Sequence, residues 1–186
     1  MTLLEMKKKV LQLIEEIDDT QDGLTNDPDI KAKMNSVINS VMFEIARMKK
    51  IHAYTELPVV KGEVVDLTTI ENFYQLRLIR VENESGNDAE FELMENLLLV
   101  KESGIAKIFY YKYPVSITDD TDDSYEFELT QDALEVMPYG VAGDLLKSDV
   151  STEYGAVYSA RYEGMLQRLD PRYSLSSITI EGGISV

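Results

Sequence analysis

The sequence predicts an α+β fold in which a discontinuous helical bundle is interrupted by an inserted antiparallel β subdomain. Apolar residues recur at helical spacing near the N-terminus and again after residue 130, whereas strand-like alternation occupies the stretch between. The predicted bundle therefore combines residues 1–56 and 130–170, with two N-terminal and two C-terminal helices. The inserted subdomain is expected over residues 57–129, and residues 171–186 are expected to form an extended C-terminal arm.

Two helices are predicted in the N-terminal part. Thr2 and Glu5 have the spacing of a capping box, and Asp27 with Pro28 supplies an N-cap followed by a first helical residue. Because a short polar loop joins the two helices, they should pack as an antiparallel hairpin. The apolar positions are Leu3, Met6, Val10, Leu13, Ile14 and Ile17 in the first helix, and Ile30, Met34, Val37, Ile38, Val41, Ile45 and Met48 in the second.

Strands are predicted between residues 57 and 129. The segments FYQLRLIRVE and IAKIFYYKYPVSI have the alternation and the aromatic and β-branched content of strands. The segment YEFEL, residues 125–129, is expected to close the same sheet. For residues 93–100 the pattern fits either a strand or a helical turn followed by a strand.

Helical spacing returns at Thr130, the expected N-cap of the third helix. Pro138 cannot continue a helix interior without losing a hydrogen bond, so a short turn before it and a new helix from it are expected. A last helix carries tyrosines at helical spacing and is expected to end at Asp170 and Pro171.

The chain is strongly acidic. Its 34 Asp and Glu residues exceed its 18 Lys and Arg residues, which gives a net charge of -16. No cluster of Lys and Arg forms a basic stripe, and direct nucleic-acid binding is therefore not expected. No apolar run approaches the roughly 20 residues that cross a bilayer, so no membrane partner is expected. The N-terminus is amphipathic and lacks the form of a signal peptide, which predicts synthesis in the cytoplasm without export.

The sequence contains no constellation that predicts catalysis. There is no cysteine, and the one histidine, His52, has neither a second histidine nor a nucleophile motif beside it. His52 follows Lys49 and Lys50, where a polar side chain is expected to help satisfy the carbonyls at a helix end. Gly-rich segments lack the spacings of phosphate-binding loops. We therefore predict a protein that is not an enzyme, with no catalytic residue and no cofactor.

The loop between the first two helices resembles a calcium loop in part. It places Asp18, Asp22 and Asp29 at ligand positions, with helices on both sides. The last ligand is Asp instead of the usual Glu, and Pro28 starts a helix within the loop. A helix-capping acidic turn without metal is therefore favoured, and calcium binding is the alternative.

A second acidic segment lies near residue 120, where no Lys or Arg is near in the sequence. It is predicted to be a solvated loop whose charges repel one another. Its acidic residues are Asp119, Asp120, Asp122 and Asp123.

Two regions are candidates for contact with other subunits. Tyr154, Tyr158 and Tyr162 either form a subunit interface or line the bundle, and the sequence leaves both readings open. The C-terminal segment SLSSITIEGGISV is rich in β-branched residues, as is typical of a strand that pairs with a sheet edge on another subunit, and a last strand folded on its own sheet is the alternative. Its candidate interface residues are Ser177, Ile178, Thr179, Ile180, Gly182, Gly183, Ile184 and Val186.

The segment ALEVMPYGVAGDLLKSDVSTEYGAVYSARYEGMLQRLDPR resembles the closing helices of head-to-tail connector (adaptor) proteins of tailed bacteriophages. The opening helix hairpin also fits that family, and EFELMENLLLV with IFYYKYP is similar to the sheet that its larger members insert. The shared features fall on Leu134, Pro138, Tyr139, Ala142, Leu145, Leu146, Asp149, Tyr154, Tyr162, Glu163, Leu169 and Asp170.

This resemblance implies a structural virion protein of the head-tail neck, assembled in the host cytoplasm. Such connectors form a homo-oligomeric ring, commonly a dodecamer, beneath the portal protein. They extend the channel for genomic DNA and dock the next neck or tail protein. An acidic wall suits a channel through which DNA passes without tight binding. The alternatives are an acidic binding module or tail-assembly accessory protein that mimics DNA, and a calcium-binding helix–loop–helix protein.

Overall fold

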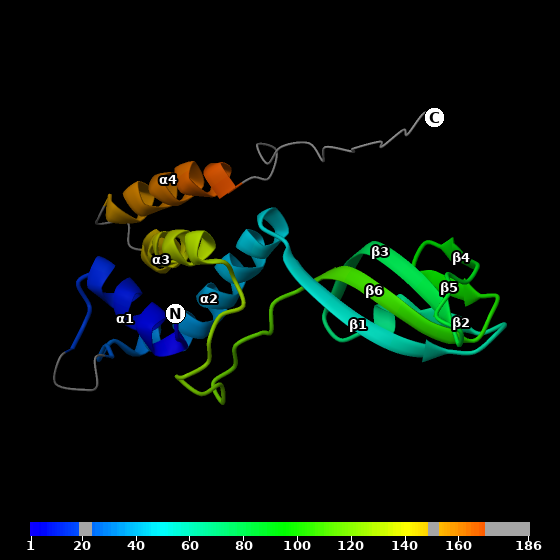
Figure 1. The fold of residues 1–186 in the computed structure, drawn as a ribbon. Coiled ribbons are helices and arrows are strands. Elements are labelled where there is room, and N and C mark those ends of the chain that lie inside the picture. The colour runs from blue at the N-terminus through cyan, green and yellow to red at the C-terminus, as the bar shows by residue number, and fades with distance from the viewer. Residues whose placement is uncertain (19–23, 149–152, 170–186) are drawn as a thin grey trace.

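The structure, a computed structural model, describes residues 1–18, 24–148 and 153–169 and has a mixed α+β fold (Figure 1). This confirms the predicted fold class, because two helices precede the strands and two follow them. The described helices are α1 (Leu3–Leu13), α2 (Pro28–Met48), α3 (Gln131–Leu145) and α4 (Tyr154–Leu166). The strands are β1 (Ile51–Val59), β2 (Val64–Asp66), β3 (Phe73–Asn83), β4 (Phe91–Met94), β5 (Leu97–Val100) and β6 (Gly104–Lys112).

Both N-terminal helices begin where the sequence predicts. The Thr2 hydroxyl accepts a hydrogen bond from the Glu5 N–H, and the Thr2 N–H donates to Glu5 Oε2 at 2.9 Å, which completes the capping box. The Asp27 carboxylate accepts from the N–H groups of Asp29 and Ile30, and Pro28 is the first residue of α2. Local hydrogen bonding therefore fixes both helix starts.

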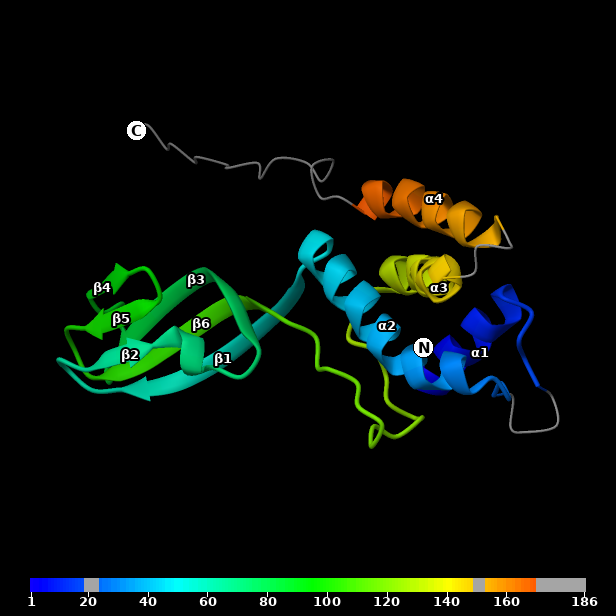
Figure 2. The ribbon, with the colours of Figure 1, turned by 180° about the vertical axis from the view of Figure 1, so that it is seen from behind.

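The four helices share one hydrophobic core, although the sheets separate the two pairs in the sequence. In Figures 1 and 2, α3 lies between α4 and the α1–α2 pair. Within the described ranges, the helices are too short or too polar to cross a lipid bilayer. The most deeply buried side chains of this core include Leu3, Met6, Leu11, Ile38, Met42, Ile45 and Met137.

The break expected at Pro138 does not occur, because α3 runs through it as one helix. Pro138 has no N–H to donate to the carbonyl of Leu134, which removes one hydrogen bond from the helix. Residues on both sides of Pro138, including Leu134, Met137 and Val141, are buried in the bundle core. Burial of this helix on the core thus outweighs the local cost of the proline.

The strands form two antiparallel sheets of three strands each, where a single sheet was expected. The larger sheet has the order β1-β6-β3, and the smaller has the order β2-β5-β4. The two sheets pack on a second core, and we call them with their loops, residues 51–112, the β region (Figure 2). This core contains Val59, Leu67, Ile79, Val81, Ala89, Leu98, Val100, Ala106, Ile108 and Tyr110.

Two strand boundaries differ from those predicted. The larger sheet begins at Ile51, six residues before the predicted start at residue 57, and residues 125–129 belong to neither sheet. Residues 125–129 run beside the start of α1 instead. The Leu3 N–H donates to the Tyr125 carbonyl at 2.9 Å, and Phe127 and Leu129 are buried in the bundle core. The apolar and acidic residues of YEFEL therefore alternate because one side of this segment packs on the helices.

The stretch over residues 93–100 forms strands, which decides between the two possibilities left open. It contains the end of β4 and all of β5, paired from Phe91↔Val100 to Met94↔Leu97. The turn between them places Glu95 at a φ of 55°, in the left-handed region. No helical turn precedes β5 in this described stretch.

Candidate functional site

The tyrosines of α4 occupy three different environments. The Tyr158 hydroxyl donates to the carbonyl of Leu13 at 2.5 Å, and the buried Tyr162 hydroxyl donates to Glu44 Oε2 at 2.8 Å. These bonds tie α4 to α1 and α2. Tyr154 is 65% exposed and lies near Val157, which is 58% exposed. The sequence treats the three alike, but the structure leaves Tyr154 on the surface and uses the other two to hold the bundle together.

Of the described tyrosines, Tyr162 has the pKa that lies furthest from its usual value. Burial, followed by the hydrogen bond to Glu44 and its charge, raises the pKa of Tyr162 well above its usual 10.0. The folded protein therefore holds this proton more tightly than the unfolded chain does. The resulting stabilisation is fully present below pH 10 and is lost as the pH rises above it.

We predict that Tyr162→Phe makes the loss of stability above pH 10 less steep. At neutral pH the variant should lose about 1 kcal/mol, because the bond to Glu44 is absent and the ring remains. The measurement is the free energy of unfolding in urea at a series of pH values from 7 to 11. Equal slopes for the variant and the original protein above pH 10 would contradict the assignment.

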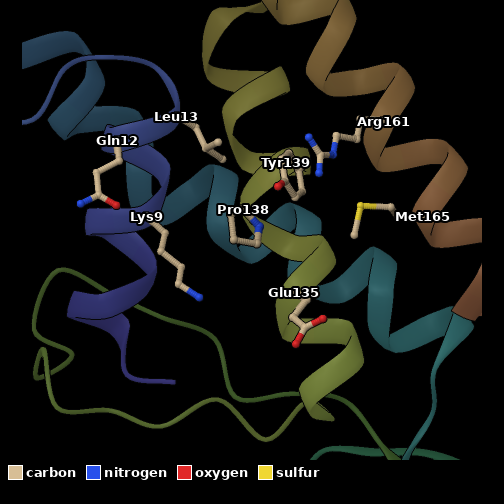
Figure 3. A pocket seen from close by; sticks show the side chains of 8 residues that line it. All are labelled: Lys9, Gln12, Leu13, Glu135, Pro138, Tyr139, Arg161 and Met165. Atoms are coloured by element: carbon tan, nitrogen blue, oxygen red, sulfur yellow. The ribbon is translucent and has the colours of Figure 1, made fainter.

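An open hollow of about 480 Å³ lies between α1, α3 and α4 (Figure 3). The guanidinium of Arg161 lies 4.2 Å from the centre of the Tyr139 ring, a cation–π contact between α4 and α3. Figure 3 shows Lys9 extending from α1 toward α3, which carries Glu135. The lining is formed by Lys9, Gln12, Leu13, Glu135, Pro138, Tyr139, Arg161 and Met165.

The lining of the hollow is mixed in chemical character. It combines apolar side chains with the charged groups of Lys9, Glu135 and Arg161. It contains no Ser, Cys, Thr or His that an adjacent base would activate. The hollow also includes Pro138 and Tyr139, which belong to the segment that carries the family resemblance.

The acidic segment at residues 119–123 is attached to the bundle. Lys7 Nζ lies 2.9 Å from Asp123 Oδ1, and the Asn35 amide donates to Asp119 Oδ1 at 3.0 Å. Hydrogen bonds from Ser124 hold the pKa of Asp122 below its usual value. Asp123 therefore has a basic neighbour in space, because Lys7, 116 positions away in the sequence, lies beside it. Asp120 is exposed.

The residues of the possible calcium loop are only partly described. The Asp18 N–H donates to the carbonyl of Leu24 at 3.2 Å, and the Asn26 amide donates to the Asp18 carboxylate. Asp29 lies in the first turn of α2, and Asp22 lies outside the described residues. Within residues 1–18, 24–148 and 153–169, no group of three or more His, Cys, Asp or Glu side chains is arranged to hold a metal ion.

His52 does not serve the helix end as expected. It lies in β1, is exposed, and places its Nδ1 atom 3.3 Å from a guanidinium nitrogen of Arg77. Its ring meets Tyr111 edge-on with centroids 5.0 Å apart. The prediction fails because the chain leaves α2 at Met48 and enters β1 at Ile51, which places His52 on the sheet surface.

The predicted interface residues of the C-terminal arm lie outside the described residues. They are Ser177, Ile178, Thr179, Ile180, Gly182, Gly183, Ile184 and Val186.

No protein-family model matches the chain, and a search of curated proteins found no match. The function proposed below therefore depends on the residues of the chain and on the order of its elements.

Proposed function

We propose that the chain is a structural subunit of a bacteriophage neck, a head-to-tail connector that forms a ring beneath the portal protein. The ring, commonly of twelve copies, extends the channel for genomic DNA and docks the next neck or tail protein. The subunit acts through contacts with other proteins and not by catalysis. It is assembled in the host cytoplasm and works in the virion.

The order of the elements is the observation that carries the proposal. The pairs α1–α2 and α3–α4 share one core, and the two sheets are inserted between them in the sequence. An opening hairpin, an inserted sheet and two closing helices are the arrangement that the resemblance to connectors implies. The order of the elements supports the proposal over the described chain and not at a single motif.

The charge of the chain supports the same proposal. A net charge of -16 weakens attraction to phosphates, because a protein that binds DNA tightly neutralises phosphates with Lys and Arg. Where the acidic surface of the subunit lines the channel, its repulsion of the DNA phosphates keeps the passing genome from binding.

The C-terminal segment is proposed to hold the subunit in the assembly. Residues 177–186 pair as a strand with a sheet edge of the portal or of a neighbouring copy, and Gly182 with Gly183 provides the hinge. In the neighbouring copy, β1 and β3 are edge strands of the larger sheet. Pro58 lies in β1. Proline within a strand is found at the edge of a sheet or at a bulge, which fits the edge position of β1.

The experiment compares the full chain with a variant that ends at Leu169. Each is measured by native mass spectrometry and negative-stain electron microscopy, alone and mixed with purified portal rings from the same phage genome. We expect rings of the full chain at one end of the portal. The truncated variant should keep its melting temperature and lose portal binding.

Three results would contradict parts of this proposal. A full chain that remains monomeric with and without portal would overturn the connector function and favour an acidic binding module. A truncated variant with a lower melting temperature would show that the segment folds on its own subunit. A rise in melting temperature on calcium titration would favour the helix–loop–helix alternative.

A further inference from the structure

The outer face of the larger sheet combines exposed apolar side chains with basic ones. Tyr54, Leu78 and Ile105 are 48%, 47% and 45% exposed. The register places Tyr54 and Leu78 on either side of Phe109, with the Tyr54 and Phe109 ring centroids 4.8 Å apart. We call this the cationic sheet face and define it by Tyr54, Leu78, Ile105 and Phe109, by the cations of Lys50, Arg77, Arg80 and Lys107, and by the carboxylates of Glu56 and Glu82, which the register places in the same rows.

Basic residues are concentrated on this sheet in a chain that is otherwise acidic. Strands β1, β3 and β6 contain four Lys or Arg residues, at positions 77, 80, 107 and 112, and two Glu residues, at positions 56 and 82. Lys50 lies just before β1, with its Nζ atom 4.7 Å from the centre of the Tyr111 ring. The face thus offers cations and aromatic rings together.

The smaller sheet presents a different surface on the other side of the shared core. Val64, Met94 and Leu97 are 55%, 56% and 40% exposed, although they lie in strands. The register places Asp66, Leu97 and Met94 in one row and Val64, Leu99 and Glu92 in the next. We call this the acidic sheet face and define it by Val64, Asp66, Glu92, Met94, Leu97 and Leu99.

The flanking segments of the smaller sheet reinforce its charge. Residues 60–72 and 84–102 together contain nine Asp or Glu residues and two Lys residues, Lys61 and Lys101. The β region therefore has a basic and aromatic face on one sheet and an acidic and aliphatic face on the other. The two faces point away from each other, because both sheets direct their buried side chains into the same core.

We propose that the cationic sheet face of one copy packs against the acidic sheet face of the next copy. The first face has four cations and two carboxylates, the second has Asp66 and Glu92, and each exposes apolar side chains that gain from burial. They cannot meet within one chain, since they lie on opposite sides of the β region. Repeated from copy to copy, this contact joins two different surfaces head to tail, which is the kind of interface that closes into a ring. The inference rests on the proposed connector function and assigns its subunit interface.

A second copy fits this face better than nucleic acid does. Glu56 and Glu82 lie among the cations of this face, and Lys107 is paired with Glu82 at 2.6 Å, so the face lacks the uninterrupted basic stripe that binds a phosphate backbone. A polyanion also offers no aliphatic surface to Tyr54, Leu78 and Ile105, whereas the acidic sheet face does.

The absence of cysteine from the chain allows a direct test by disulfide cross-linking. Leu78 and Met94 are exposed members of the two faces, so Leu78→Cys with Met94→Cys leaves both cores intact. Under mild oxidation of the full chain at ring-forming concentration, we expect a ladder of covalent dimers, trimers and larger species. Leu78→Cys alone and Met94→Cys alone should give no ladder, because in a head-to-tail contact neither residue meets its own copy.

The matched control is Leu78→Cys with Val115→Cys. Val115 is 42% exposed and lies outside both faces, so this pair reports random collision and should not cross-link. Rings that form without the Leu78–Met94 ladder would overturn this interface and leave the connector function standing. A ladder from Leu78→Cys alone would show a symmetric contact and also overturn it. If the original protein forms no ring alone or with portal, both proposals are wrong.

Discussion

Replacing Gly104 by alanine is expected to open the larger sheet and to destabilise the β region by about 3 kcal/mol or more. A Cβ atom at this position would lie 1.9 Å from the carbonyl oxygen of Glu82 and 2.9 Å from the Cα of Asn83. Both are backbone atoms of β3, which pairs with β6 from Asn83↔Gly104 onward. The strand cannot move aside without breaking this end of the ladder, whose hydrogen bonds are then lost.

The effect of Gly104→Ala should be confined to the β region, because the bundle has its own core. Hydrogen exchange followed by mass spectrometry measures the two parts separately: we expect faster exchange in peptides from residues 51–112 and unchanged exchange in α1, α2 and α3. The matched control is Ile105→Ala, which truncates an exposed side chain of the same strand and should cost no more than about 1 kcal/mol. Equal stability of Gly104→Ala and the original protein would contradict the close approach of β3.

The sequence predicts the features of this fold that depend on neighbouring residues. Thr2 with Glu5 and Asp27 with Pro28 determine two helix starts through contacts within one turn, and both predictions are confirmed. The period of the apolar residues likewise predicts the four helices and the intervening strands, because it reflects which side of each element is buried.

The features that the sequence does not predict depend on distant partners. Residues 125–129 have the alternation of a strand, but they pack beside α1. Nothing in the local sequence indicates that α1 is their neighbour. Pro138 stays within α3 because residues far away in sequence bury that helix. The pairing of Lys7 with Asp123 is hidden for the same reason. The two sheet faces also become visible only once the register decides which side chains point outward.

Replacing Gly140 by leucine is expected to separate α4 from the rest of the bundle and to cost about 3 kcal/mol. A Cβ atom at Gly140 would lie 2.8 Å from ring atoms of Tyr162 and 2.8 Å from Cγ1 of Val41. Both side chains are buried, and the Tyr162 ring is held by the bond from its hydroxyl to Glu44, so neither yields easily. The gain in helix propensity over glycine, about 1 kcal/mol, does not offset this overlap.

The same substitution at Gly164 provides the matched control for Gly140→Leu. Gly164 lies on α4 with open space where its Cβ would be, so Gly164→Leu should leave stability unchanged or raise it by up to about 1 kcal/mol. Urea unfolding measures both variants, and the ultraviolet titration of tyrosine provides a second signal. Displacement of Tyr162 from its buried site and from Glu44 would bring its pKa down toward the usual 10.0. If Gly140→Leu and Gly164→Leu were equally stable, the close packing of α3 against α4 at Gly140 would be contradicted.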